Sequence, residues 1–157
     1  MQEATLCFLM KEINGEKELL LAMKKEGFGE GRWNGIGGRF DSKNDKNILA
    51  TAKRELKEEI GVIAQEIKKV AILRFYFPYQ KDWNQNVHVF FVKNWQGEPK
   101  ETGEMKPKWF KIDEIPFNQM WPDDKLWLPR ILNEEKLKAK FVFKPGELID
   151  SHEIKTI

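Results

Sequence analysis

The chain has 157 residues, of which 41% are hydrophobic and 33% charged, a composition typical of one globular domain over residues 1–157. Its 27 basic and 25 acidic side chains nearly cancel, which excludes a strong field for gripping a nucleic-acid polymer. Cys7 is the only cysteine, and no apolar run approaches the roughly 18 residues of a membrane span. We expect a cytoplasmic protein with no disulfide, no secretory leader and no membrane partner.

The first part of the chain predicts two strands, a glycine-rich loop and a helix. They cover residues 5–10, 18–23, 27–38 and 45–61. Asn44 or Asp45 can cap the start of the helix, and Gly61 can close its end.

The rest of the chain predicts five more strands and a second helix. The strands cover residues 70–77, 87–92, 108–111, 140–144 and 148–154. The helix covers 122–136, and Pro129 inside it is expected to kink the helix or delay its start. This order of elements predicts an α/β fold with a mixed sheet between helices.

The first helix carries an unusual group of carboxylates. One arc of this helix is apolar and contains Leu49, Ala52, Leu56 and Ile60. Glu55, Glu58 and Glu59 share a neighbouring arc, because they stand at positions i, i+3 and i+4. We therefore expect three carboxylates to converge at the border of the buried face.

This arrangement is locally unfavourable for the helix. Glu55 and Glu59 are like charges four residues apart, which costs about a few tenths of a kcal/mol, and they lie near the negative end of the helix dipole. Mg²⁺, or Mn²⁺ as a substitute, would reverse both penalties and bridge carboxylates to substrate phosphates. The three glutamates alone equally fit a solvated helix face, so the interpretation depends on their surroundings.

Gly38 followed by residues 54–62 resembles the signature motif of the Nudix hydrolases. That pattern is Gly, five residues, Glu, seven residues and then Arg-Glu-apolar-x-Glu-Glu-x-Gly-apolar, and the second half matches at each fixed position. The first half departs from it: Lys46 stands where the family has Glu, and two extra residues separate Gly38 from Arg54. Either Asp45 partly replaces the missing acid or nothing does. We expect activity to survive, because the family's metal chemistry depends mostly on the second half.

Other segments resemble one branch of this family, the MutT homologues that hydrolyse 8-oxo-dGTP and other oxidised purine nucleoside triphosphates. In matching order over nearly the whole chain, they are residues 23–38, 87–90, 104–110 and 120–124. The resemblance implies the Nudix α/β/α sandwich and products that are a nucleoside monophosphate and pyrophosphate. It also implies a monomer that acts on a small-molecule nucleotide and sanitises the nucleotide pool.

The resemblance further implies a magnesium site and its catalytic residues. The implied ligands are Glu55, Glu58, Glu59, the Gly37 carbonyl and Glu104. Glu59 or Glu58 would position or deprotonate the attacking water, and Arg54 would orient one of these glutamates by a charge-assisted hydrogen bond. For Glu104, a plain loop carboxylate is an equally good interpretation.

Aromatic side chains are the candidates for holding the base. Our hypothesis is that Trp121 stacks on the purine and that Phe28 and Phe75 form apolar walls. By the same resemblance Lys24 contacts the substrate and Thr5 lines the pocket, although a surface position for Lys24 is nearly as good an interpretation.

Asn34, Asp123 and Asp124 are the candidates for reading the edge of the base. Two adjacent buried carboxylates can share one proton, so that one donates and the other accepts a hydrogen bond. The alternative is that Pro122 and the two aspartates merely begin a helix, where these residue types are common.

Gly37 and Gly38 permit a close approach of the backbone, and they do not match a phosphate-binding P-loop, which requires Gly-Lys-Ser/Thr. His88 stands in an apolar strand without a Cys or His partner nearby, so we expect it in the core or in a pocket wall rather than on a metal.

Two alternatives to this function remain open. The chain could be a Nudix hydrolase of another purine nucleotide, such as a methylated purine triphosphate or a dinucleotide. It could also be a non-catalytic nucleotide-binding module, which the altered first half of the motif permits.

Overall fold

Eight strands form one mixed sheet in the computed structural model, which describes residues 1–157. The strands are β1 (Gln2–Ile13), β2 (Glu16–Lys24), β3 (Trp33–Asn34), β4 (Ile63–Tyr76), β5 (Gln85–Gln96), β6 (Met105–Lys111), β7 (Leu137–Lys144) and β8 (Leu148–Thr156). Their order is β3-β2-β1-β5-β4-β7-β8, with β6 also paired to β2. The pairs β1–β5 and β4–β7 are parallel, and the others are antiparallel.

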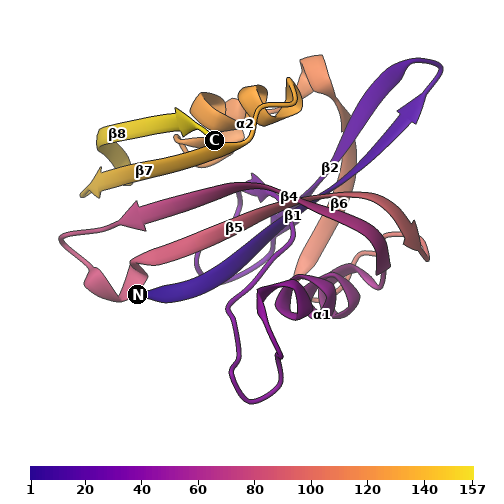
Figure 1. Ribbon diagram of the computed structural model, residues 1–157, viewed down its shortest axis with the longest axis horizontal. Coiled ribbons are helices and arrows are strands. Elements are labelled where there is room, and N and C mark those ends of the chain that lie inside the picture. The colour runs from indigo at the N-terminus through magenta and orange to yellow at the C-terminus, as the bar shows by residue number, and fades with distance from the viewer.

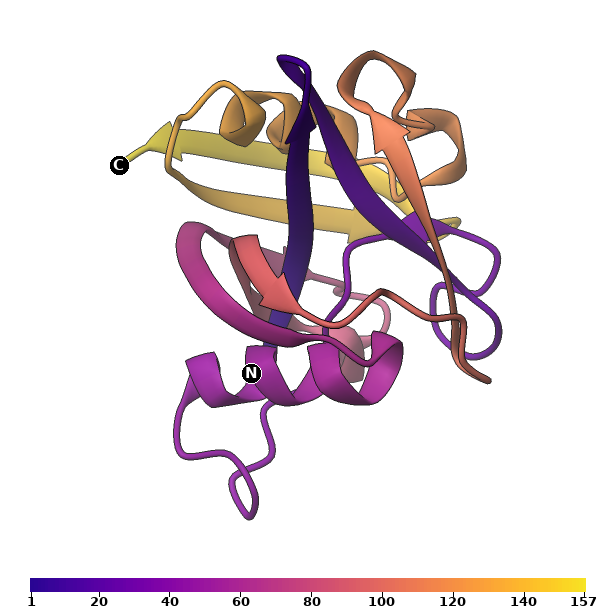
Figure 2. The same cartoon turned by 90° about the vertical axis from the view of Figure 1, so that its right-hand side faces the viewer.

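Two helices, α1 (Ile48–Ile60) and α2 (Asp124–Leu132), cover opposite faces of the sheet (Figures 1 and 2). Three short 3₁₀ helices complete the fold: η1 (Lys81–Trp83), η2 (Ile112–Glu114) and η3 (Phe117–Gln119). The predicted mixed sheet between helices, an α/β/α sandwich, is therefore confirmed. None of the helices is long and apolar enough to cross a bilayer.

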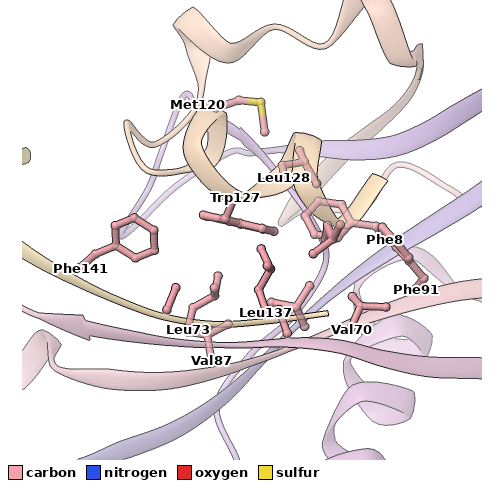
Figure 3. Packing of buried hydrophobic residues seen from close by; sticks show 14 of the residues in the cluster. Phe8, Val70, Leu73, Val87, Phe91, Met120, Trp127, Leu128, Leu137 and Phe141 are labelled. Carbon is pink, nitrogen blue, oxygen red and sulfur yellow. The ribbon is translucent and has the colours of Figure 1, made fainter. Parts of the chain in front are cut away.

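The sheet separates two hydrophobic clusters, because successive side chains of a strand point to opposite faces. In β1, Phe8 packs into the larger cluster with α2, whereas Cys7 and Leu9 pack into the smaller one with α1. Trp127 of α2 is fully buried between the helix and the sheet (Figure 3). This indole fixes the position of the first turn of α2 relative to the strands.

The predicted strands are confirmed, and most are longer than the apolar runs indicated. β3 was not predicted, because two residues are too short to show a period. The prediction that α1 begins at 45 is wrong: it begins at Ile48, and the Asn47 side chain accepts a 2.9 Å hydrogen bond from the Ala50 amide. Gly61 ends the helix in the left-handed region, as predicted. Leu49 is 36% exposed, so its predicted place on the buried arc is wrong.

The second helix is shorter than the predicted segment 122–136. It begins only at Asp124 and ends at Leu132, with Pro129 inside it. Asp123 stands at the N-cap position, but its side chain makes no capping hydrogen bond. That carboxylate does not cap the helix and instead lines the cavity described next, which the interpretation of 122–124 as a simple helix start does not explain.

Candidate active site

A cavity of about 340 Å³ opens between the glycine-rich loop, the first strand and the start of α2. All ten side chains or backbones predicted to bind substrate line it: Thr5, Lys24, Phe28, Asn34, Gly37, Gly38, Phe75, Trp121, Asp123 and Asp124. The cavity ends beside the carboxylates of α1, because Gly38 lies directly against Glu55. The structure thus brings the residues predicted to bind the base next to the residues predicted to bind the metal.

The floor of the cavity is formed by residues 36–38, which lie beside β1 as an irregular strand. The amide of Thr5 donates to the Gly38 carbonyl at 2.9 Å, and the amide of Ile36 donates to the Cys7 carbonyl at 2.8 Å. A Cβ atom on Gly37 would lie 1.8 Å from the Thr5 carbonyl oxygen. Only glycine fits there, which explains the glycine-rich sequence without a phosphate-binding loop.

Glu55 and Glu59 form a pair of acids on the face of α1 next to this floor. Burial raises the pKa of Glu55. Burial, together with the negative charges of Glu55 and Glu104, raises the pKa of Glu59 to about 8, while the positive charge of Lys24 acts in the opposite direction. The two carboxylates are therefore costly to keep ionised side by side without a cation.

Arg54 organises these acids from one side. Its Nη1 donates to Glu55 Oε1 at 2.8 Å and to Glu58 Oε2 at 3.1 Å. The predicted orienting contact of Arg54 with a glutamate is present. The side chain of Glu58 is 59% exposed and turns toward solvent, so the expected convergence holds for Glu55 and Glu59 but does not include Glu58.

Asp45 holds Arg54 in place. Its two carboxylate oxygens accept from Arg54 Nε at 2.8 Å and from Nη2 at 2.9 Å, and it also accepts from Thr51 Oγ1 at 2.8 Å. These bonds, above all those from Arg54, hold the pKa of Asp45 well below its usual range. Lys46 is exposed. The altered motif left open whether Asp45 partly replaces the missing glutamate or nothing does. The structure shows that Asp45 is an acid paired with Arg54, the arginine of the motif.

The resemblance to the Nudix motif implies a divalent metal ion, and the acids of α1 fit such an ion. Glu59 Oε2 is buried without a hydrogen-bond partner, and an orphaned carboxylate oxygen beside a second raised-pKa acid is a natural cation ligand. No group of three His, Cys, Asp or Glu side chains is arranged as a complete cage. Glu55 and Glu59 are therefore the acids brought together here, and ligation by Glu58, Glu104 and the Gly37 carbonyl stays a prediction.

The aromatic end of the cavity is a slot. The Phe28 ring lies 5.1 Å from the Trp121 ring and 5.0 Å from the Trp83 ring. Phe75 lines the cavity while its other face stacks on Phe141 at 5.6 Å. The predicted apolar walls are in place, and Trp83 adds a wall that no sequence motif indicated.

Asp123 and Asp124 lie at the bottom of this slot and are 2% and 3% exposed. Burial raises the pKa of Asp123 to about 6. Burial and the charge of Asp123 raise the pKa of Asp124 well above its usual value. Asp124 Oδ2 has no hydrogen-bond partner. The pair can therefore share one proton and face a ligand with both a donor and an acceptor.

The remaining predicted residues are distributed around the same cavity. Asn34 lines it from β3, with its Oδ1 accepting from the Gly35 amide at 2.9 Å. His88 does not line it and is not in the core: its Nε2 pairs with Glu3 Oε1 at 2.8 Å, and its Nδ1 lies 2.7 Å from Lys69 Nζ. The expectation of a core or pocket-wall histidine is therefore wrong, because two charged neighbours hold the ring in a polar network.

Several cavity residues were not predicted from the sequence: Arg32, Arg39, Phe77, Trp83 and Phe143. Arg32 lies inside the glycine-rich segment whose neighbours were identified, so its position was the available signal. Phe143 comes from β7, and nothing in its local sequence indicates that the strand returns to this cavity.

Comparison with known proteins agrees with this geometry. The NUDIX domain model matches residues 2–131. The chain is 41% identical over 136 residues to an oxidized purine nucleoside triphosphate hydrolase of Danio rerio, covering 87% of this chain and 85% of the relative. It is 39% identical over 141 residues to the protein of that name from Mus musculus, covering 90% and 88%.

A solved structure, that of a Mutator MutT protein from Bacillus halodurans, has the same fold. The two superpose with a TM-score of 0.79 over 99% of this chain and 98% of the other, at 23% sequence identity. At that identity the similarity concerns the fold alone, while the family model and the relatives cover the helix with Glu55 and Glu59. The chain belongs to the Nudix hydrolase family.

Proposed function

We propose that this protein hydrolyses oxidised purine nucleoside triphosphates such as 8-oxo-dGTP to the monophosphate and pyrophosphate, with Mg²⁺ as the metal. The support comes from relatives of that name, about 40% identical over most of both chains. The single observation that carries the proposal is the buried Asp123–Asp124 pair beside Trp121, at the opposite end of the cavity from Glu55.

The acid pair supplies a reason for selecting an oxidised base. Oxidation of guanine changes which atoms of the base donate and which accept hydrogen bonds. A singly protonated pair offers one hydroxyl donor and several acceptor oxygens, and it can move the proton between Asp123 and Asp124 to suit the base. Trp121 would stack on the purine ring and so contribute affinity without distinguishing bases.

The acids of α1 would act on the phosphates. The metal would be held by Glu55 and Glu59, with Glu58, Glu104 and the Gly37 carbonyl as further ligands. When bound, the ion neutralises phosphate oxygens and favours displacement by water. Glu59, or else Glu58, positions or deprotonates the attacking water, while Arg54 holds the glutamates in orientation.

We also propose that the enzyme acts as a monomer on the nucleotide pool of the cytoplasm.

Pyrophosphate release with and without Mg²⁺ tests the proposal, measured on 8-oxo-dGTP, dGTP, 2-hydroxy-dATP and a methylated purine triphosphate. We expect magnesium-dependent release that is fastest for an oxidised purine. Faster release from the methylated purine, or from a dinucleotide, would assign the enzyme to another purine substrate. Binding without release would make it a non-catalytic nucleotide-binding module.

A further inference from the structure

Arg32 connects the aromatic slot to a distant turn of the chain. It lies in the loop between β2 and β3, and its guanidinium stacks on the Trp121 ring at 4.1 Å from the centroid. The same guanidinium forms an ion pair through Nη2 with Glu147 Oε2, which lies 115 residues further along the chain in the turn between β7 and β8. Arg32 therefore bridges the base slot and the closing hairpin.

Glu147 stands at a position of the turn whose backbone conformation is unfavourable for glutamate. Glu147 has φ 59° and follows Gly146, which has φ 90°. Glycine, asparagine and aspartate tolerate this left-handed region, whereas a residue such as glutamate costs about 1 kcal/mol there. The turn geometry alone thus gives no reason for this residue type, while the ion pair with Arg32 does.

Arg32 also faces the cavity. Its Nη1 is buried without a hydrogen-bond partner, and the side chain lines the cavity next to Asp123 and Asp124. The positive charge of Arg32 partly offsets the rise in pKa that burial causes in both aspartates. A free guanidinium would gain by swinging into solvent, so a contact outside the slot is needed to keep it against Trp121.

We propose that Glu147 and Arg32 form a latch that fixes the Trp121 ring for stacking on the purine, which makes both of them positioning residues for base recognition. This inference rests on the proposed function, since it assigns a role to the same slot. The planar guanidinium stacks on the indole, and the Phe28 ring lies 5.1 Å from the same indole. A purine that stacks on Trp121 therefore takes the place of the 41% exposed Phe28 ring, while Arg32 stays against the indole. Glu147 sets the orientation of that plane by a charge-assisted hydrogen bond.

The latch predicts an effect on substrate affinity rather than on chemistry. In Glu147→Gln, the guanidinium loses its charged partner, and we expect KM for 8-oxo-dGTP to rise about tenfold with kcat nearly unchanged. Arg32→Lys keeps the charge but loses the planar stack, so it should give a similar increase. The double variant should not exceed the larger single effect, because both changes break one unit.

A matched control exists at the other end of the molecule. Glu135 pairs with Arg130 at 2.9 Å, and the two side chains are each 35% exposed, against 27% and 37% for Arg32 and Glu147. Neither Arg130 nor Glu135 lines the cavity. Glu135→Gln therefore removes a comparable ion pair and should leave KM unchanged.

Two measurements test the latch. The first is KM and kcat for the variants, with the affinity for 8-oxo-dGMP measured by calorimetry without metal. The second is the indole N–H signal of Trp121 in ligand-free protein, assigned by NMR with Trp121→Phe. We expect Glu147→Gln and Arg32→Lys to shift or broaden that signal and Glu135→Gln to leave it in place.

Opposite outcomes separate the latch from the proposed function. An unmoved indole signal, or a fall in kcat with unchanged KM, would overturn the latch. Equal effects of Glu147→Gln and Glu135→Gln on the indole signal would also overturn the latch. Both changes would then act through a general loss of protein stability. If wild-type protein does not prefer an oxidised purine but the indole signal shifts as expected, the proposed function fails and the latch around Trp121 stands.

Discussion

The indole Nε1 of Trp127 donates a 2.7 Å hydrogen bond to Asp123 Oδ2, and both side chains are buried. Trp127 belongs to the larger hydrophobic cluster, so this bond fixes one acid of the base slot to the core (Figure 3). An N–H donor favours the ionised form of its partner. This bond therefore favours Asp123 as the acceptor of the pair, and it favours Asp124, whose Oδ2 has no hydrogen-bond partner, as the holder of the shared proton in the ligand-free protein.

The first prediction concerns base selectivity. Asp123→Asn and Asp124→Asn should each reduce the ratio of kcat/KM for 8-oxo-dGTP over dGTP by roughly tenfold or more, because an unmatched buried donor or acceptor costs about 1–3 kcal/mol. Steady-state kinetics on both substrates measures this ratio. If neither variant changes it, the acid pair does not read the base.

The second prediction concerns the pH dependence of base binding. Below the pKa of Asp123, about 6, both acids are protonated and the slot loses its carboxylate acceptor. Affinity for 8-oxo-deoxyguanosine should therefore fall as pH decreases through about 6, and fall again at high pH when Asp124 ionises. The nucleoside is the suitable ligand, since a phosphate group titrates with a pKa of about 6 as well.

Calorimetry at several pH values measures this dependence, with Asp123→Asn as its control. The asparagine does not titrate, so the acid side of the profile should disappear in that variant. An acid side that persists in Asp123→Asn would assign the titration to another group.

The third prediction concerns the stability contributed by Asp45. Its folded-state pKa lies below the unfolded value of about 3.9, so its stabilising effect is complete above that value and is lost as pH falls toward the folded pKa. Asp45→Asn should lower the free energy of unfolding by about 2 kcal/mol at pH 7, and the difference should narrow below about pH 4. Urea unfolding of the wild type and of Asp45→Asn at pH 7 and at pH 3 measures this difference in the free energy of unfolding.

Glu101→Gln is the control for Asp45→Asn. It breaks the exposed ion pair with Lys25 and should leave the free energy of unfolding nearly unchanged, because solvent screens such pairs. A loss in Asp45→Asn that is equally large at pH 3 would show that packing, rather than charge, accounts for the effect.

The sequence alone predicted the part of the site that lies on a single helix, because the spacing along that helix determines which side chains share a face. Glu55 and Glu59 stand one helical turn apart, and burial of Leu56 and Ile60 fixes which way that face turns. The helix start was missed, because Asp45, a good capping residue, is used by Arg54 instead.

Contacts between distant segments could not be read from the sequence. Trp83 meets Phe28 although the two lie 55 positions apart in the sequence, and Glu147 meets Arg32 at a separation of 115 positions. No local pattern marks such partners, because a loop aromatic or a turn glutamate is compatible with many surroundings. The tertiary fold alone decides that these side chains meet.

The fourth prediction concerns the acid proposed to act on water. Glu59→Gln should lower kcat by at least about a hundredfold, because the amide neither accepts a proton nor carries a charge, while binding of 8-oxo-dGMP remains measurable. Glu114→Gln, an exposed change on η2, should leave kcat unchanged. Full activity in Glu59→Gln would remove this residue from the mechanism.

The fifth prediction separates two neighbouring glycines of the cavity floor. A Cβ on Gly37 would meet the Thr5 backbone carbonyl, which cannot move aside, so Gly37→Ala should lower the free energy of unfolding by about 3 kcal/mol. A Cβ on Gly38 would lie 2.4 Å from Glu55 Cδ, the mobile end of a side chain. Gly38→Ala should therefore fold with nearly normal stability but lose most of its activity, because Glu55 is displaced.

Gly103→Ala provides the matched control for both glycine variants, since nothing lies within 4 Å of a Cβ at that position. Thermal unfolding and kcat, measured together on the three variants, give the comparison. We expect Gly103→Ala to change neither quantity, Gly37→Ala to lower the unfolding temperature, and Gly38→Ala to lower kcat. Normal activity in Gly38→Ala would mean that hydrolysis does not require Glu55 to stay in its position against this floor. Of the two acids Glu55 and Glu59, only Glu59 would then be needed.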